Sequence, residues 1–232
     1  MIDELLPHWV AAVETHGDDE ADRAPLYPEE QEVVARAVDK RRREFSAVRA
    51  CARRAMAKLG LPPVPVLPGE RGAPRWPEGL IGSMTHCDGY RAAALVHATD
   101  LASLGIDAEP HRPLPDGILP AVALPAERER LALLGARRPE VHWDRVLFSA
   151  KESVYKAWYP LTGKWLDFEE ADIEIHMPSG TASYGRFRAE LLVPGPVVGG
   201  RRLGHFEGVW TVGRGLIGTA VTIPQVCPSS TA

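Results

Sequence analysis

The chain has 232 residues, of which 45% are hydrophobic and 25% charged, and its formal net charge is −4. These values suit a globular protein with a sizeable core, in one large domain or in two small ones packed together. The negative charge argues against a protein that mainly coats nucleic acid or anionic membrane. We therefore expect neither of these among its partners.

The cysteines and the N-terminal residues indicate where in the cell the protein is located. The three cysteines are widely spaced and form no C-x-x-C, so the sequence suggests neither a disulfide framework nor a zinc site. The N-terminal MIDELLPHWV is acidic where a signal peptide would be basic, and no run approaches the roughly 18 apolar residues that span a membrane. We expect a soluble cytoplasmic protein.

The first elements are helical. Residues 3–15 predict a short amphipathic helix, and the acidic, proline-containing segment 17–28 predicts a loop. Along residues 39–60, apolar side chains recur at spacings of three and four, which predicts a helix with one buried stripe that stops at Gly60.

The charge is distributed unevenly around this helix. Residues 1–35 carry ten acids and one base, whereas residues 36–58 carry nine bases and two acids. Such a basic block is either a solvated helix face or an anion site. A ridge along one side could grip a phosphate, and it consists of Arg42, Arg49 and Arg53, with Arg41 near its edge.

The pattern then changes to strands. The Pro- and Gly-rich residues 61–79 predict a long exposed loop that carries Arg71, and loops of this length often have a function. Apolar runs bounded by turn residues follow it and predict three strands. These lie at residues 80–86, 90–98 and 101–109.

A second Pro-rich connection, at residues 110–120, separates these strands from another set of helices and strands. Helices are predicted at 126–134 and 149–161, and strands at 171–177, 185–193, 205–212 and 215–223, before a frayed tail. We expect an α+β protein of two similar-sized halves, 1–112 and 113–232.

Two acidic residues end the third strand, in the stretch GIDAEP. Side chains alternate along a strand, so Asp107 and Glu109 are predicted to point the same way and could share one ion. The alternative is that this pair is merely solvated.

The helix at 149–161 presents a polar face, because Ser149, Glu152 and Lys156 follow one another at spacings of three and four. Such a Glu–Lys pair is common as surface decoration, and the helix alone does not decide between decoration and function. Together, Asp107, Glu109 and Glu152 offer only oxygen ligands, which suit Mg²⁺ or Mn²⁺ and not zinc.

The motifs that the chain lacks restrict its chemistry further. There is no G-x-x-x-x-G-K-[ST] phosphate loop, no G-x-S-x-G elbow and no G-x-G-x-x-G. Acidic oxygens for a hard cation, together with nearby bases for an anionic ligand, indicate phosphoryl transfer in which the nucleophile belongs to another molecule.

The two motifs and their spacing resemble a known family. GIDAEP, followed by FSAKESVYKAWYP, resembles the signatures of the 4′-phosphopantetheinyl transferase superfamily. The upstream SMTHCDG, KRRREFSAVRACARRAM and GERGAPRWP are similar to segments of its Sfp- and EntD-like branch, which includes PptT-like members. The resemblance covers about residues 36–165 and implies a pseudo-dimer of two similar α+β halves.

The resemblance also implies a reaction and roles. A carrier-protein serine would attack the β-phosphorus of coenzyme A and release adenosine 3′,5′-bisphosphate. Asp107, Glu109 and Glu152 would hold Mg²⁺, with Mn²⁺ as an alternative, and Glu152 would take the serine proton while Lys156 neutralises the phosphates. The coenzyme A-binding residues implied by the matched segments are Arg41, Arg49, Arg71, Thr85, His86, Lys151 and Lys156.

The implied partners are apo acyl and peptidyl carrier proteins of polyketide and nonribosomal peptide assembly, bound by a monomer. Two other readings remain open from the residues. A Mg²⁺-dependent phosphohydrolase would use the same carboxylates to activate water. Alternatively, residues 39–59 could be a nucleic-acid-binding helix.

Overall fold

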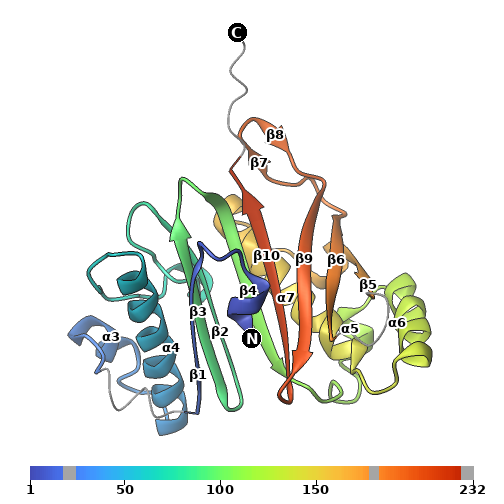
Figure 1. The fold of residues 1–232 in the computed structure, drawn as a ribbon, viewed down its shortest axis with the longest axis horizontal. Coiled ribbons are helices and arrows are strands. Elements are labelled where there is room, and N and C mark those ends of the chain that lie inside the picture. Colours follow the sequence, from blue (N-terminus) through green and yellow to red (C-terminus); the bar gives the residue numbers. More distant parts are fainter. Residues whose placement is uncertain (18–24, 178–182, 226–232) are drawn as a thin grey trace.

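Two antiparallel sheets lie side by side in this protein, and each carries one long helix (Figure 1). The structure is a computed structural model that describes residues 1–17, 25–177 and 183–225. The predicted α+β class is confirmed. Among these described residues, no helix combines the length and apolar content needed to cross a bilayer.

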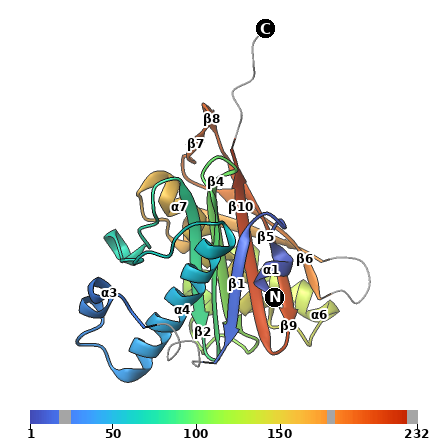
Figure 2. The ribbon, with the colours of Figure 1, turned by 60° about the vertical axis from the view of Figure 1, so that its left-hand side comes forward.

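The N-terminal sheet has the strand order β1-β3-β2. Its strands are β1 (Ala11–His16), β2 (Leu80–Cys87) and β3 (Tyr90–His97). Helix α4 (Asp39–Lys58) runs along this sheet and buries its alanine-rich stripe against β1 and β3, with α3 (Pro28–Val33) beside it (Figure 2).

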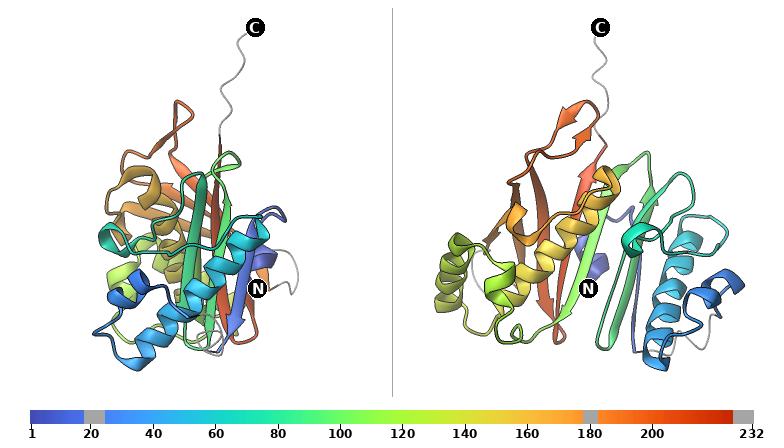
Figure 3. Two further views of the ribbon diagram at one scale, coloured as in Figure 1. Left: turned by 90° about the vertical axis from the view of Figure 1, so that its left-hand side faces the viewer. Right: turned by 180° about the vertical axis from the view of Figure 1, so that it is seen from behind.

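The C-terminal sheet has the order β4-β10-β9-β6-β5. Its strands are β4 (Leu101–Pro110), β5 (Ala171–His176), β6 (Tyr184–Leu191), β9 (His205–Gly213) and β10 (Leu216–Pro224). Helix α7 (Trp143–Thr162) crosses one face, near α5 (Leu119–Val122) and α6 (Pro125–Arg137) (Figure 3). A small hairpin, β7 (Val197–Val198) and β8 (Arg201–Arg202), projects beyond the sheet. The short helices η1 (Glu70–Gly72) and η2 (Phe168–Glu170) lie in connecting loops.

The two sheets meet where β2 lies beside β4. The junction is made by side-chain hydroxyls: the Ile106 N–H donates to Ser83 Oγ at 3.0 Å, and the Ala108 N–H donates to Thr85 Oγ1 at 3.0 Å. Both bonds flank Asp107, so this carboxylate lies at the seam between the halves.

Most elements agree with the sequence predictions to within a few residues, but the helix predicted at 3–15 is wrong. The structure has a short helix α1 (Ile2–Leu5) followed by β1. Both faces of β1 are covered, because Val10 and Ala12 pack toward one core while Ala11 and Val13 pack toward another. A strand buried on both faces shows no alternation, so its apolar run is easily read as a helix.

Two of the sequence predictions are not tested by the described structure. The predicted loop at 17–28 and the predicted tail fall largely on residues outside the described ranges. Strand β4 pairs with β10 and so shares a sheet with the C-terminal strands. The division into 1–112 and 113–232 stays a prediction.

Candidate active site

Gly105 allows α7 to lie directly against β4. A Cβ atom at this position would stand 2.0 Å from the Ser153 carbonyl oxygen, so only glycine leaves room for the helix backbone. The Ser103 hydroxyl donates to the Ala157 carbonyl at 2.7 Å and fixes the same contact. The glycine of GIDAEP therefore places the acid two residues later against the polar face of α7.

Asp107 is held by side chains from both halves. Its Oδ2 accepts from Ser149 Oγ at 2.8 Å, and its Oδ1 accepts from Lys156 Nζ at 2.7 Å and from Thr85 Oγ1 at 3.1 Å. The residue is 4% exposed, and charge-assisted hydrogen bonds of this kind are stronger than those between neutral groups. The predicted polar face of α7 thus lies against Asp107.

Glu109 follows on the same strand and is half-buried. Its Oε2 accepts from Arg145 Nη1 at 2.9 Å. Burial raises the pKa of Glu109, the neighbouring Asp107 raises it further, and Arg145 and Lys156 oppose the shift. The two acids of GIDAEP therefore form one electrostatic unit.

Glu152 differs from the other two acids in its contacts. Its carboxylate is half-buried and, among the described residues, forms no hydrogen bond or ion pair with another side chain or with the backbone. Burial raises the pKa of Glu152 and Asp107 adds to this, whereas Lys156 lowers it. A half-buried carboxylate without a donor is poised to accept a proton or to bind a cation.

The three acids are not assembled into a metal site in this arrangement. Within the described ranges, no three His, Cys, Asp or Glu side chains converge closely enough to hold an ion. Lys156 and Arg145 instead pair with Asp107 and Glu109. The all-oxygen donor set and the unpartnered Glu152 fit a hard divalent cation chemically, provided that Lys156 releases Asp107.

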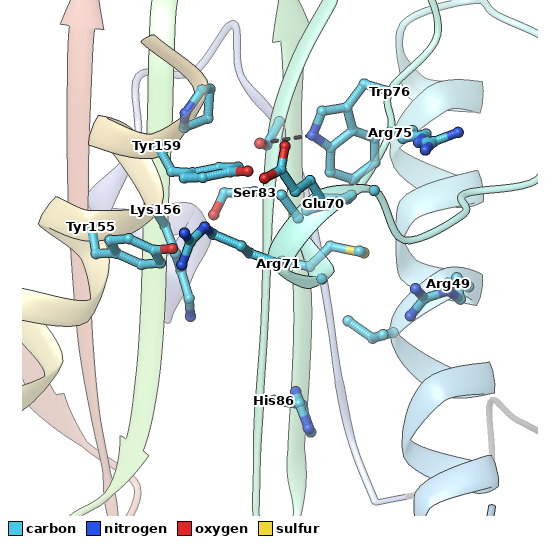
Figure 4. A pocket seen from close by; sticks show the side chains of 18 of the residues that line it. Arg49, Glu70, Arg71, Arg75, Trp76, Ser83, His86, Tyr155, Lys156 and Tyr159 are labelled. Carbon is cyan, nitrogen blue, oxygen red and sulfur yellow. Dashed lines mark hydrogen bonds between the residues drawn. The ribbon is translucent and has the colours of Figure 1, made fainter. Parts of the chain in front are cut away.

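A cleft of about 520 Å³ lies beside these residues. It is bounded by α4, the loop at 69–76, β2 and the C-terminal half of α7, and Figure 4 shows the side chains that line it. Its basic residues come from several elements, while Trp76 and Met84 supply apolar surface. The basic residues are Arg41, Arg49, Arg71, Arg75, His86 and Lys156.

Arg49 reaches this cleft from the buried side of α4. Its Nε donates to the Val66 carbonyl at 3.1 Å, and its guanidinium carbon stands 3.2 Å from the centre of the Phe45 ring. Burial lowers the pKa of Arg49, as do Arg41 and Arg53, while Glu30 opposes them. A bound anion would offset this unfavourable charge.

Arg41 and His86 meet at the cleft, with Arg41 Nη1 3.0 Å from His86 Nε2. Burial lowers the pKa of His86, and Arg41 lowers it further, while the carboxylate of Glu44 at 3.9 Å opposes them. The imidazole is therefore held toward its neutral form, in which Nε2 accepts from Arg41.

Arg71 lies in the loop opposite α7. Its backbone has a φ of 54°, a left-handed conformation that non-glycine residues seldom adopt. Its guanidinium carbon stands 5.7 Å from the Trp165 ring, and Figure 4 shows the side chain directed toward Tyr155 and Tyr159 of α7. Arg71 thus approaches the C-terminal half from the N-terminal one.

A smaller groove of about 200 Å³ adjoins the cleft. Glu152 and Tyr155 line both cavities, and Trp165 and Phe168 form the far wall of the groove. The unpartnered carboxylate therefore stands where two cavities meet.

Lys151 also lines the smaller groove, but its ammonium group is engaged within the protein. Its ammonium group is 2.8 Å from Glu127 Oε2, and it donates to the carbonyls of Phe168 and Ala171 at 2.5 and 2.9 Å. These three acceptors match its three protons. Lys151 thus joins α7 to α6 and to the start of β5, and its predicted role in binding coenzyme A stays a prediction.

Thr85 lies on β2, beside Asp107 of the other sheet. Its hydroxyl donates to Asp107 and accepts from the Ala108 N–H, and the residue is 2% exposed. The Thr85 hydroxyl therefore contacts the Asp107 carboxylate, and its predicted role in coenzyme A binding stays a prediction. In the arginine ridge, Arg53 pairs with the fully buried Glu30 at 2.9 Å, and Arg42 donates to the Ala37 carbonyl.

The sequence also matches two family models. Residues 29–96 match the 4′-phosphopantetheinyl transferase N-terminal domain, and residues 103–192 match the 4′-phosphopantetheinyl transferase superfamily. The chain is 60% identical to 4′-phosphopantetheinyl transferase Svp of Streptomyces mobaraensis, over 100% of this chain and 92% of Svp. The chain belongs to the 4′-phosphopantetheinyl transferase superfamily.

Further relatives agree with this assignment. The phosphopantetheinyl transferase is 50% identical to Npt of Nocardia iowensis, over 95% of this chain and 99% of Npt. It is 48% identical to PptT of Mycobacterium tuberculosis, over 84% and 85% of the two chains. The predicted family is confirmed, and with it an Sfp-type enzyme built as two similar α+β halves.

Sequence reasoning missed Arg145 in this phosphopantetheinyl transferase. The predicted helix began at Ser149, whereas α7 begins at Trp143. Extending the helix by two turns toward its N-terminus puts Arg145 on the same face as Ser149, Glu152 and Lys156, at intervals of four, three and four residues. The helical spacing was therefore a usable signal.

Proposed function

We propose that the protein transfers the 4′-phosphopantetheine group of coenzyme A to a serine of apo acyl or peptidyl carrier proteins, including those of polyketide and nonribosomal peptide assembly. One observation carries this: Asp107 of β4, fixed by α7, lies beside the unpartnered Glu152 where two cavities meet. Coenzyme A likewise has two arms, a nucleotide and a pantetheine, joined at a pyrophosphate.

The basic cleft suits the nucleotide arm. Arg41, Arg49, Arg71 and His86 line it, and guanidinium groups match phosphate oxygens in geometry and charge. The smaller groove, walled by Trp165 and Phe168, suits the less polar pantetheine arm. The pyrophosphate then stands at the junction, next to Glu152 and Lys156.

The transfer requires no nucleophile from the enzyme. The carrier serine oxygen forms a bond to the β-phosphorus, the bond from that phosphorus to the bridging oxygen breaks, and adenosine 3′,5′-bisphosphate leaves. Glu152 takes the hydroxyl proton, directly or through a water, and its raised pKa suits a general base. Lys156 neutralises charge on the phosphates.

Asp107, Glu109 and Glu152 would hold Mg²⁺, or Mn²⁺ in its place, against the pyrophosphate. The ion would neutralise charge on the phosphate oxygens. Lys156 pairs with Asp107, and we propose that this ammonium moves to the phosphates when the ion and coenzyme A bind. Ser149 and Thr85 keep Asp107 in place during this exchange.

Both sides of the site come from one chain, which supports a monomeric enzyme. Among the described residues, no disulfide joins Cys51 and Cys87, which fits a cytoplasmic location. Carriers are typically acidic helical bundles, and the basic rim of the cleft would attract them electrostatically. The nucleic-acid alternative has less support, because Arg49 and Arg53 of α4 are buried and bonded within the protein.

One assay tests the proposal. The protein is incubated with coenzyme A, Mg²⁺ and a panel of apo carriers, and the carriers are weighed by mass spectrometry. We expect one phosphopantetheine added at the carrier serine, with one adenosine 3′,5′-bisphosphate released per carrier. Release of that nucleotide without a carrier would instead favour the phosphohydrolase.

A further inference from the structure

Arg145 links the second acid of the site to the rest of the protein. It lies in the first turn of α7 and is 8% exposed. All three of its nitrogens are bonded: Nη1 donates to Glu109 Oε2 at 2.9 Å, Nε to the Arg112 carbonyl at 3.2 Å, and Nη2 to the Pro113 carbonyl at 2.8 Å. The planar guanidinium therefore has a fixed orientation, and so does the carboxylate it holds.

We infer that Arg145 is a positioning residue that acts on the transfer reaction through Glu109. This inference rests on the proposed function, in which Glu109 faces the divalent cation. Because Arg145 occupies Oε2, the other oxygen of Glu109 is left to face the cation or a water bound to it. Arg145 thereby sets which oxygen is presented and where it stands.

The local charges explain why such a residue is needed. Asp107, Glu109 and Glu152 are three acids in electrostatic contact, and burial together with Asp107 raises the pKa of both glutamates. Lys156 and Arg145 are the countercharges of the two acids on β4. Lys156 is partly exposed and lines the cleft, whereas Arg145 is buried, bonds to two backbone carbonyls and is not among the cleft-lining residues. Of these two bases, Arg145 is therefore the one that stays paired with its acid, Glu109.

A purely structural role for Arg145 makes a different prediction. Its bonds to two backbone carbonyls could serve only to hold residues 110–114 against α7. Asp144 provides a matched control, because its Oδ2 accepts from the Leu114 N–H at 2.7 Å and so anchors the same loop without touching Glu109. Asp144→Ala should loosen the loop and leave Glu109 held by Arg145.

The test is a double-mutant cycle with Arg145→Gln, Glu109→Gln and their combination, alongside Asp144→Ala. Three quantities are measured on the intact protein: kcat for transfer to an apo carrier, the KM for coenzyme A, and the Mn²⁺ dissociation constant from the spin-resonance signal of the free ion. In the native background we expect Arg145→Gln to lower kcat about tenfold and to change the Mn²⁺ dissociation constant at least about threefold, with the KM for coenzyme A unchanged.

In the Glu109→Gln background, Arg145→Gln should change either quantity by less than about twofold. Asp144→Ala should leave the Mn²⁺ constant unchanged. Equal effects of Arg145→Gln in both backgrounds would overturn the inference, because they would show a through-space charge or a general loss of structure. Equal effects of Asp144→Ala and Arg145→Gln would also overturn it.

If Arg145→Gln fails to fold, Arg145→Lys keeps the charge but cannot make all three bonds, and the same cycle is run with it. The role of Arg145 and the proposed function can be refuted separately. A native enzyme that transfers phosphopantetheine while its variants combine independently would refute the role of Arg145 alone. A native protein that neither binds Mn²⁺ nor modifies a carrier would refute the proposed function as well.

Discussion

Lys156 Nζ lies 2.7 Å from Oδ1 of Asp107, in a carboxylate position that a divalent cation would also use. The two residues come from α7 and β4, and Ser149 holds the other oxygen at 2.8 Å. If Asp107 binds a divalent cation as we propose, that cation must compete with the Lys156 ammonium group for this oxygen. This relationship predicts how variants of the two residues should differ.

Asp107→Asn should abolish transfer, whereas Lys156→Met should leave Mn²⁺ binding intact or tighter. The amide loses the charge that attracts the cation, and the methionine removes the competing ammonium. Isothermal titration with Mn²⁺ and with coenzyme A, each alone and then together, checks both statements. Lys156→Met should weaken coenzyme A binding in the presence of the ion. Weaker Mn²⁺ binding in Lys156→Met would contradict the competition.

Glu152→Gln should abolish transfer and at the same time stabilise the fold near pH 7. Burial raises the folded-state pKa of Glu152, so keeping this group ionised costs folding free energy once the pH exceeds its unfolded value. The neutral glutamine removes that cost, and we expect a melting temperature higher by on the order of 2 °C at neutral pH. The gain should vanish as the pH falls below the unfolded pKa, where both states bind the proton. A lower melting temperature of Glu152→Gln at neutral pH would argue against a folding cost of keeping Glu152 ionised.

Lys151→Met and Arg49→Ala should separate stability from coenzyme binding. The methionine leaves the fully buried Glu127 without its ammonium partner, which typically costs about 3–5 kcal/mol of unfolding free energy. Its coenzyme A affinity, measured on the folded fraction, should match that of the native enzyme. Arg49→Ala should instead weaken coenzyme A binding through the lost phosphate contact. The double variant Lys151→Met/Glu127→Gln should regain part of the lost stability, because the glutamine carries no unpaired charge. If Lys151→Met instead lowers the affinity for coenzyme A without lowering the stability, Lys151 binds the coenzyme.

Gly105→Ala tests whether the contact between β4 and α7 builds the site. The added Cβ would meet the Ser153 carbonyl at 2.0 Å, so the helix must shift, at a cost of about 1–3 kcal/mol or more. We expect a lower melting temperature and a loss of transfer, because Ser149 and Lys156 move away from Asp107. Gly135→Ala in α6 is the matched control, since nothing lies within 4 Å of its Cβ position and it should stabilise by about 0.5–1 kcal/mol. Native activity in Gly105→Ala would show that α7 is not positioned by this glycine.

The sequence predicted an element correctly where its residue pattern is typical of a single kind of secondary structure. The 20-residue helix α4 and strands β2 to β4 follow from periodicity and turn residues, and the spacing of Ser149, Glu152 and Lys156 predicted their common face. Strand β1 was missed because it is buried on both faces. The interior partner of Lys151 could not be found, because Glu127 lies on another helix and nothing local marks the pair. Motif matching likewise gave no sign that the Thr85 hydroxyl bonds to Asp107 and to the Ala108 N–H, because these partners lie on another strand.

The hydroxyl bonds across the β2–β4 seam tie activity to the association of the halves. Ser83 and Thr85 belong to one sheet and Asp107 to the other, so the acid is completely oriented only after both have folded and docked. A nascent or half-unfolded chain would lack this orientation even with every motif residue present. We therefore expect two separately expressed halves to gain activity only on recombination, because Asp107 accepts its hydrogen bond from Thr85 only across the assembled seam.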